Sequence, residues 1–270
     1  MRLSRPVLQQ LVAEQPYPLL FATVSGAHLY GFPSVNSDYD LRGVHLLPVH
    51  EVIGLTEPRE TIEVSTDRFA ALDASGSPAP ENLGIPLEID LVTHDARKYF
   101  EMLLKRNGYV LEQLFSPLVI HSGQTHARLI DIARDCITRH HAHHYLGFSR
   151  KQWALFRHRP RVKTLLYTYR VLLTGIHLMR SGEIEANLMR LNDHFDLSHV
   201  DKLLALKLRG EEHAALQTAD IKEFEFHRNE FERLTRELEL ARDRSSLPDN
   251  PTARHALSEL LVDLRMNGVR

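Results

Sequence analysis

The spacing of the apolar residues changes near residue 120, and this change limits the fold more than any other feature of the 270-residue sequence. Before it, short apolar runs alternate with turn residues, which is typical of β-strands. After it, apolar residues recur every three or four positions, as in "KTLLYTYRVLLTGIHLM", which is typical of amphipathic helices. We therefore predict a domain of strands and helices over 1–120 and a helical domain over 121–270. The predicted strands lie within 17–26, 39–47, 60–65, 86–93 and 116–123.

The composition is that of a globular protein with a sizeable core, since 43% of the residues are hydrophobic. No apolar stretch approaches the roughly 18–20 residues that a membrane span needs, and the first residues lack the apolar core of a signal peptide. The single cysteine, Cys136, fits a reducing compartment and a buried structural role. We expect a cytoplasmic protein without membrane contact. Residues 73–86, rich in Pro, Gly, Ser and Ala, indicate a surface loop.

Positive charge is concentrated in one part of the chain, although the net charge is only −2. Residues 136–180 contain no Asp or Glu, and they carry nine Lys or Arg residues and six histidines. A surface built from this segment would be electropositive and suited to phosphate. The segment also contains aromatic residues that could stack on bases but are equally typical of a core. These aromatic residues are Tyr145, Phe148, Trp153, Phe156, Tyr167 and Tyr169.

Two aspartates one residue apart occur in the stretch "NSDYDLRGVHLL". Residues two apart on a strand share a face, so Asp38, Asp40 and Arg42 would point to the same side. Two close carboxylates repel each other, and a cation between them would relieve the repulsion. Mg²⁺ is a suitable cation because it takes hard oxygen ligands. The alternative is a solvated turn that happens to contain "SDYD".

The segments on either side of this pair add phosphate-binding and acidic groups. Upstream, Gly26 and Ala27 follow an apolar run in "LLFATVSGAHLYG", where small residues let backbone N–H groups approach an anion. Downstream, "LEIDLV" places Glu88 and Asp90 on one strand face, so a third carboxylate could join the first two from an adjacent strand. Such a set suits two-metal phosphoryl transfer, in which paired ions stabilise the attacking and leaving oxygens.

With these residues the sequence resembles the DNA polymerase β-type nucleotidyltransferase superfamily. The shared pattern is a glycine and a small residue, ten residues, Asp-x-Asp on a strand, and a later strand with a central Asp. The wider match, with "IDLVTHDARKYFEMLLKRNGYVLEQLFSP" and "LLALKLRGE", resembles its RNA-repair-associated branch, the nucleotidyltransferases found alongside RNA ligases. This resemblance implies an α+β fold: a small mixed β-sheet flanked by helices, followed by an α-helical C-terminal domain.

The resemblance also implies roles for the carboxylates. Asp38 and Asp40 match the metal-binding pair for Mg²⁺ or Mn²⁺, and Asp90 matches the third catalytic and metal-binding carboxylate, which orients and activates the attacking hydroxyl. Glu88 remains an alternative for the third carboxylate, since it shares the strand face with Asp90.

The phosphate-binding loop of the superfamily corresponds to Gly26 and Ala27. The superfamily usually has Ser at the position of Ala27, where its hydroxyl can bind a phosphate oxygen, whereas Ala keeps only its backbone donor. Triphosphate binding would then depend also on Ser25, His28 or a basic side chain.

Three basic residues are candidates for contact with the nucleotide. Arg42 would either contact phosphate or neutralise the aspartates. Lys98 and Lys163 match basic positions of the branch and could hold triphosphate oxygens as point charges. A solvated helix face would explain Lys98 equally well. Glu112 matches a recurrent acidic position, for which we expect a structural role.

The histidine run "HHAHHYLGF" has two interpretations. His140 and His144 lie four apart and could ligate zinc, but no Cys or carboxylate stands nearby in the sequence to complete a site. A basic polar helix face is the simpler interpretation, and His141 could also touch phosphate.

Three functions are compatible with these features. The first is a nucleotidyltransferase that moves a nucleoside monophosphate from an NTP such as ATP to an acceptor hydroxyl, with an RNA end as the acceptor. The second is transfer of AMP to a protein side chain, as in small nucleotidyltransferases that act as antitoxins. The third is a non-catalytic nucleotide- or RNA-binding module, which Ala27 favours. The three carboxylates argue against the third function, because binding alone does not need so many like charges.

Overall fold

The computed structural model describes residues 5–34, 37–66, 88–209 and 221–269, except the side chain of residue 221, and the loop predicted over 73–86 lies outside this part. The chain divides into two compact units. The first contains Met1–Leu29, Val35–Cys136 and Pro251–Arg270, and the second contains Tyr30–Ser34 and Ile137–Asn250. Both units are therefore built from segments that are separate in the sequence.

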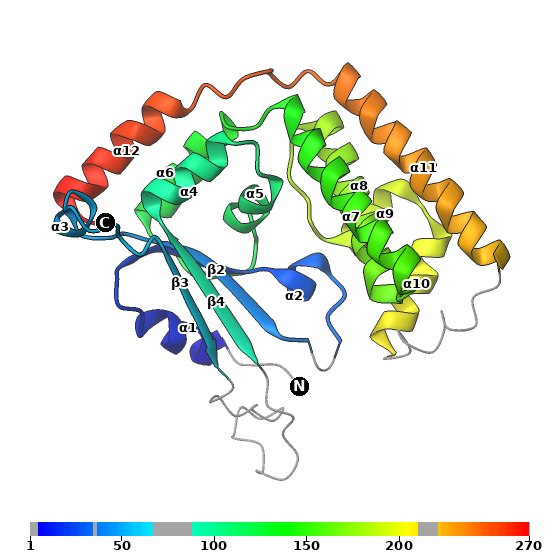
Figure 1. Ribbon diagram of the computed structural model, residues 1–270, viewed down its shortest axis with the longest axis horizontal. Helices are drawn as coiled ribbons and strands as arrows, with labels where there is room; N and C mark the ends of the chain where they lie inside the picture. Colours follow the sequence, from blue (N-terminus) through cyan, green and yellow to red (C-terminus); the bar gives the residue numbers. More distant parts are fainter. Residues whose placement is uncertain (1–4, 35–36, 67–87, 210–220, 270) are drawn as a thin grey trace, which may run out of the picture. The chain divides into compact units, whose positions relative to one another are not determined.

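The first unit is built on a five-stranded mixed sheet (Figure 1). Its spatial order is β3-β4-β2-β1-β5, in which β2 and β4 are parallel and the other neighbours are antiparallel. The strands are β1 (Leu19–Val24), β2 (Tyr39–His45), β3 (Thr61–Thr66), β4 (Ile89–Asp95) and β5 (Val119–His121). The helices are α1 (Arg5–Ala13), α2 (Gly26–Tyr30, whose last residue belongs to the second unit), α3 (Val49–Val52), α4 (Ala96–Leu104), α5 (Gly108–Leu114), α6 (Gln124–Arg134) and α12 (Arg254–Asn267).

Helices cover both faces of the central strands. On one face, Leu41 and Leu91 join a cluster of buried side chains to which α1 contributes Leu8, Leu11 and Val12. On the other face, the ring of Phe21 stacks on His126 of α6, with centroids 4.6 Å apart, and its edge meets Tyr99 of α4. Alternate residues of β2 and β4 thus point into different environments, as their two-residue period requires.

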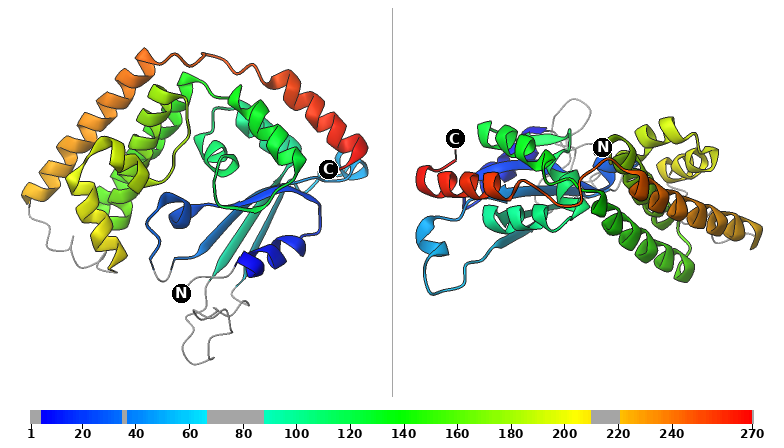
Figure 2. Two further views of the ribbon diagram at one scale, coloured as in Figure 1. Left: turned by 180° about the vertical axis from the view of Figure 1, so that it is seen from behind. Right: turned by 90° about the horizontal axis from the view of Figure 1, so that it is seen from above.

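Helix α12 returns to the first unit from the far end of the chain, and it lies beside α4 and α6 in the views of Figures 1 and 2. Its Arg265 donates to both carboxylate oxygens of the buried Asp95 at 2.6 and 2.7 Å. Asp95 also accepts from the backbone N–H groups of Leu47 and Arg97, and thereby caps α4. This ion pair fixes α12 to the ends of β2 and β4.

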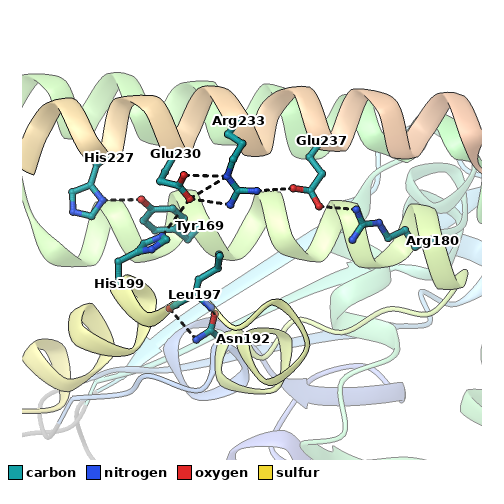
Figure 3. Close-up of polar contacts among 9 residues, drawn as sticks. All are labelled: Tyr169, Arg180, Asn192, Leu197, His199, His227, Glu230, Arg233 and Glu237. Carbon is teal, nitrogen blue, oxygen red and sulfur yellow. Dashed lines mark hydrogen bonds and ion pairs between the residues drawn. The ribbon is translucent and has the colours of Figure 1, made fainter.

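The second unit is helical. Helices α7 (Ala142–His158) and α8 (Val162–Ser181) are joined by a short turn, and α11 (Ile221–Arg244) packs against both. Tyr169 Oη of α8 and His227 Nδ1 of α11 are hydrogen-bonded at 2.7 Å, and burial lowers the pKa of His227 to about 4 (Figure 3). Alongside, Arg233 pairs with two glutamates of α11. The elements are η1 (Arg139–His141), α7 (Ala142–His158), α8 (Val162–Ser181), α9 (Leu188–Phe195), α10 (Ser198–Leu208) and α11 (Ile221–Arg244).

A five-residue segment from the N-terminal part of the sequence, Tyr30–Ser34, belongs to this helical unit. The guanidinium carbon of the buried Arg170 lies 3.7 Å from the centre of the Tyr30 ring. Lys207 Nζ donates to Ser34 Oγ at 3.3 Å. Gly31 has a φ of +87°, and a Cβ there would lie 2.5 Å from Asn187 Oδ1. These contacts hold the segment Tyr30–Ser34 within the second unit.

The architecture confirms the predicted α+β class, with a mixed sheet, flanking helices and a helical region after it. Cys136 is buried, as expected, and burial raises the pKa of its thiol to about 12. In the described part of the chain, no helix combines the length and apolar character that crossing a membrane requires.

Candidate active site

Asp40 of β2 and Asp90 of β4 lie directly opposite each other in the parallel ladder. Neighbouring residues in register share a face of the sheet, so the two carboxylates point to the same side from strands about 4.8 Å apart. Both residues are partly buried. The structure thus brings together two of the three predicted carboxylates, which are fifty residues apart in the sequence.

Arg42 holds Asp40 from two residues further along β2. Its Nη2 donates to Asp40 Oδ1 at 2.8 Å, while Nη1 donates to the carbonyl oxygens of Leu41 and Asp90 and Nε to Tyr109 Oη. Burial alone would lower the pKa of Arg42, but Tyr109 and Asp40 outweigh it and raise the pKa of the guanidinium. Because most of its donors are used within the chain, these contacts favour neutralisation of Asp40 over contact with phosphate.

The loop between β1 and α2 approaches Asp40 closely. Gly26 has a φ of +63°, and a Cβ on this residue would lie 1.9 Å from Asp40 Oδ2. The N–H group of Ser25 donates to the carbonyl oxygen of Asp40 at 2.7 Å. Ser25 Oγ is buried and has no hydrogen-bond partner among the described residues. A glycine is therefore required at position 26 both by its backbone conformation and by the adjacent carboxylate.

Four other predicted residues lie around this loop and the start of the strands. Ala27 is half-buried in α2, and the neighbouring ring of His28 stacks on Tyr39, with centroids 4.0 Å apart. Asp38 is exposed and directly precedes β2, so it is not part of the strand face that the sequence suggests. Glu88 is also exposed, before β4, and accepts a hydrogen bond from Ser65 Oγ.

Lys98 is not brought to the paired aspartates. Its Nζ donates to Thr61 Oγ1 at 2.6 Å, and Thr61 lies opposite His94 in the β3–β4 ladder. His94 is four residues beyond Asp90, which corresponds to about 13 Å along the strand. Lys98 also lowers the pKa of His94, after the larger effect of burial.

The remaining candidates have separate environments. Lys163 is exposed in the first turn of α8, in the second unit, and Glu112 is buried in α5. His140 Nε2 lies 3.2 Å from Asp249, whereas His144 is partly buried and its ring stacks on Phe148. Burial, followed by nearby cations, lowers the pKa of His144 to about 4.

The residues around Asp40 and Asp90 fit a hard divalent cation. Both offer carboxylate oxygens on one face, Asp40 Oδ2 faces the bare Cα of Gly26, and Asp38 lies nearby in the sequence. In the described ranges, no three His, Cys, Asp or Glu side chains are already gathered to hold a metal ion. A site with one or two carboxylates, completed by substrate phosphate oxygens, is the kind that Mg²⁺ usually occupies.

The sequence matches the RNA repair pathway DNA polymerase beta family over residues 4–76 and 80–263. The chain belongs to this family. Membership of the RNA repair pathway DNA polymerase beta family indicates a polymerase β-type nucleotidyltransferase, which agrees with the resemblance noted in the sequence.

Two relatives are similar over shorter stretches. The uncharacterized protein MJ0002 of Methanocaldococcus jannaschii is 30% identical over 195 residues, which cover 70% of this chain and 72% of the relative. The uncharacterized protein YcgL of Bacillus subtilis is 26% identical over 160 residues, which cover 58% of this chain and 54% of the relative. Neither name assigns an activity.

Sequence reasoning missed one residue of the site in this family member. Tyr109, which binds Arg42, is 67 residues away from it, and only the helix start at Asn107 is visible in the sequence. Outside the site, the assignment of Tyr30–Ser34 to the helical unit also has no signal in the sequence, although Tyr30 and Phe32 pack there against Tyr167.

Proposed function

We propose that this chain is a nucleotidyltransferase that transfers a nucleoside monophosphate from a nucleoside triphosphate to the hydroxyl of an RNA end. The new bond joins the acceptor oxygen to the α-phosphorus, the bond from the α-phosphorus to the bridging oxygen breaks, and pyrophosphate leaves. The RNA acceptor is supported by the description of the family, which names RNA repair.

The observation that carries this proposal is the in-register pair of Asp40 and Asp90 beside Gly26. Two partly buried carboxylates on one strand face repel each other, and the described residues neutralise only Asp40, through Arg42. A structural role would not require this arrangement, whereas a site for cations and phosphates does.

The proposed mechanism gives each residue a defined task. Backbone N–H groups of Gly26 and Ala27, with the unpartnered Ser25 Oγ, bind phosphate oxygens of the triphosphate. Asp90 orients the acceptor hydroxyl and accepts its proton at a carboxylate oxygen. Arg42 holds Asp40 in position through Oδ1.

Asp38, Asp40 and Asp90 would hold Mg²⁺ or Mn²⁺, which, when bound, supplies positive charge that stabilises the developing negative charge on the attacking and leaving oxygens. Arg42 leaves Asp40 Oδ2 available for this purpose among the described residues.

Incubation of the full chain with each NTP labelled at the α-phosphate, with Mg²⁺ or Mn²⁺ and with RNA, DNA or protein acceptors, tests the proposal. We expect label on RNA, and we expect Asp40→Asn and Asp90→Asn to lower its rate by more than about a hundredfold. Asp131→Asn, at an exposed position of α6, is the matched control and should retain the rate. Label on protein would indicate AMP transfer to a side chain instead, and label on no acceptor would indicate a binding module.

A further inference from the structure

The second half of α7, the connection that follows it and the first turn of α8 carry a group of exposed cationic side chains, which we call the basic turn. Every member is exposed, and among the described residues none of its lysines or arginines forms an ion pair. The basic turn consists of Lys151, Arg157, His158, Arg159, Arg161 and Lys163.

Three of the four exposed arginines of helix α11, in the same unit, form ion pairs along that helix, and Arg244 at its end forms none among the described residues. Arg228 pairs with Glu225, Arg233 with Glu230 and Glu237, and Arg236 with Glu232, all within one turn of the helix. Such pairs stabilise an exposed helix and balance its charge. The basic turn has no acidic residue within its own two helices, since residues 136–180 contain none. Its charge is therefore not used to stabilise α7 or α8 in this way.

The helix dipoles explain the positions of only some of the positive charges in the basic turn. Arg157 and His158 lie in the last turn of α7, where cations are favourable. Arg161 and Lys163 lie at the start of α8, where the partial positive charge of the helix disfavours cations. Keeping positive charge there costs stability, and an anionic partner would offset that cost.

Most of the aromatic residues of this segment are not available for stacking on bases. The sequence allowed base stacking by six aromatic residues, but Tyr145, Trp153, Phe156 and Tyr169 are buried in the unit. Phe148 and Tyr167 are partly buried, and Tyr167 packs against Tyr30 and Phe32. The exposed groups of the basic turn are cations, which are among the main donors to phosphate oxygens in nucleic-acid complexes.

We propose that the basic turn binds the phosphodiester backbone of single-stranded RNA, as the surface that holds the acceptor strand. This inference rests on the proposed function for the identity of the strand, but not for the binding itself. Recognition by cations alone neutralises phosphates and releases counterions, so binding is strongly salt-dependent and nearly independent of base sequence.

The test measures binding of fluorescein-labelled single-stranded RNA to the full chain by anisotropy, over a series of KCl concentrations and without NTP. For wild type, the logarithm of the affinity should fall linearly with the logarithm of the salt concentration, by about 0.7 for each phosphate contacted. The triple variant Arg157→Glu, Arg159→Glu, Arg161→Glu should bind RNA at least about tenfold more weakly, with a slope shallower by about 2. Uridine-rich and adenine-rich RNA should bind alike.

A matched triple variant, Arg59→Glu, Arg244→Glu, Arg254→Glu, changes the net charge equally at exposed arginines elsewhere. It should keep the wild-type slope. Equal loss in both triple variants, or an unchanged slope in the first, would overturn the inference. Binding of the wild type to phosphatidylserine vesicles but not to RNA would also overturn it. Circular dichroism shows whether each variant is folded.

Label transfer, assayed in parallel, separates this inference from the proposed function. Transfer to RNA by wild type with an unchanged salt slope in the first triple variant would overturn only the basic turn as the RNA surface. RNA binding that depends on the basic turn, without transfer of label, would overturn only the catalytic proposal.

Discussion

The aspartates at the two ends of the parallel pair β2–β4 lie in opposite environments. At one end, Asp40 lies opposite Asp90, and the Asp40 side chain is 31% exposed with Arg42 as its side-chain partner. At the other end, Asp95 lies opposite His45, and its side chain is 2% exposed with four hydrogen bonds. The same two strands thus carry a partly exposed pair of aspartates at one end and a buried, fully hydrogen-bonded aspartate at the other.

This difference indicates that Asp95 serves the stability of the fold and that Asp40 serves function. The two oxygens of the buried Asp95 carboxylate accept from one arginine nitrogen, Nη2 of Arg265, and from two backbone N–H groups. No capacity is left for a ligand, so the role of this carboxylate is to fix the fold. Asp40, in contrast, is partly exposed, and its Oδ2 lies beside Gly26 without a partner among the described residues. This carboxylate contributes little to stability and is available to bind a ligand. The predictions below test this contrast, beginning with the largest expected effect.

An Asp→Asn substitution should lower the free energy of unfolding much more at Asp95 than at Asp40. Asp95→Asn leaves the partly buried Arg265 without its counter-charge, and we expect a loss of about 3–5 kcal/mol in the free energy of unfolding. Asp40→Asn should change it by less than about 1 kcal/mol, because removal of one repelling carboxylate compensates for the weakened contact with Arg42. Urea unfolding of the full chain, followed by circular dichroism, measures both. Equal losses of unfolding free energy in the two variants would contradict the proposed difference between the two ends.

The closed end should also respond to acid. Burial lowers the pKa of His45 to about 4, below its ordinary value of 6.5, so the folded chain favours the neutral ring. Its contribution to stability is present above pH 6.5 and is lost as the pH falls from 6.5 towards 4. The free energy of unfolding of the wild type should therefore fall between pH 7 and pH 5, and His45→Gln should make this fall smaller by on the order of 1–2 kcal/mol. Thermal unfolding at a series of pH values measures this, and identical pH profiles would contradict it.

The open end should be most sensitive at its glycine. Gly26→Ala forces a side chain into a left-handed backbone conformation, which costs about 1–2 kcal/mol, and it displaces the Asp40 carboxylate. Nucleotidyl transfer should therefore fall together with stability. Gly147→Ala is the control, because Gly147 lies within α7 with open space around it, and alanine there should stabilise by about 0.5–1 kcal/mol. Wild-type transfer by the Gly26→Ala variant would show that this loop is not part of the active site.

The smallest effect concerns the phosphate loop. Ala27→Ser adds a hydroxyl that can donate to a charged phosphate oxygen, worth about 1.5 kcal/mol, or tenfold in affinity. Calorimetric titration with a non-hydrolysable NTP and Mg²⁺ measures the change, and Ser25→Ala shows whether the neighbouring hydroxyl already has this role. Weaker NTP binding by Ala27→Ser would show that the loop is shaped for the methyl group.

The elements of this fold could be predicted from the sequence because they depend on local periodicity. Three of the five strands lie within the predicted stretches, while β3 ends one residue and β4 two residues beyond them. The two-residue period placed Asp90 on the face opposite to Leu91. The register between β2 and β4 could not be predicted, because alternation defines the face of a strand but not the residue opposite. Asp38 illustrates the limit at a strand end, since the pattern continues through it while β2 begins at Tyr39.

Long-range placement was the other gap. The spacing within α4 cannot show that Lys98 meets Thr61, because this depends on how the helix packs along the sheet. The charge bias of 136–180 indicated the cations of the basic turn, but it could not separate exposed aromatic residues from buried ones such as Trp153. Arg265 and Asp95 meet across 170 residues, and no local pattern encodes such a contact.

The position of α12 has a consequence for synthesis on the ribosome. Asp95 is translated early, but Arg265 follows it by 170 residues, so the whole helical unit leaves the ribosome first. At common rates of about 5–20 residues per second, the sheet waits roughly 10–30 seconds with an unpaired buried carboxylate. During that interval Asp95 lacks its counter-charge and the first unit lacks α12, and a premature stop before residue 251 would make both losses permanent.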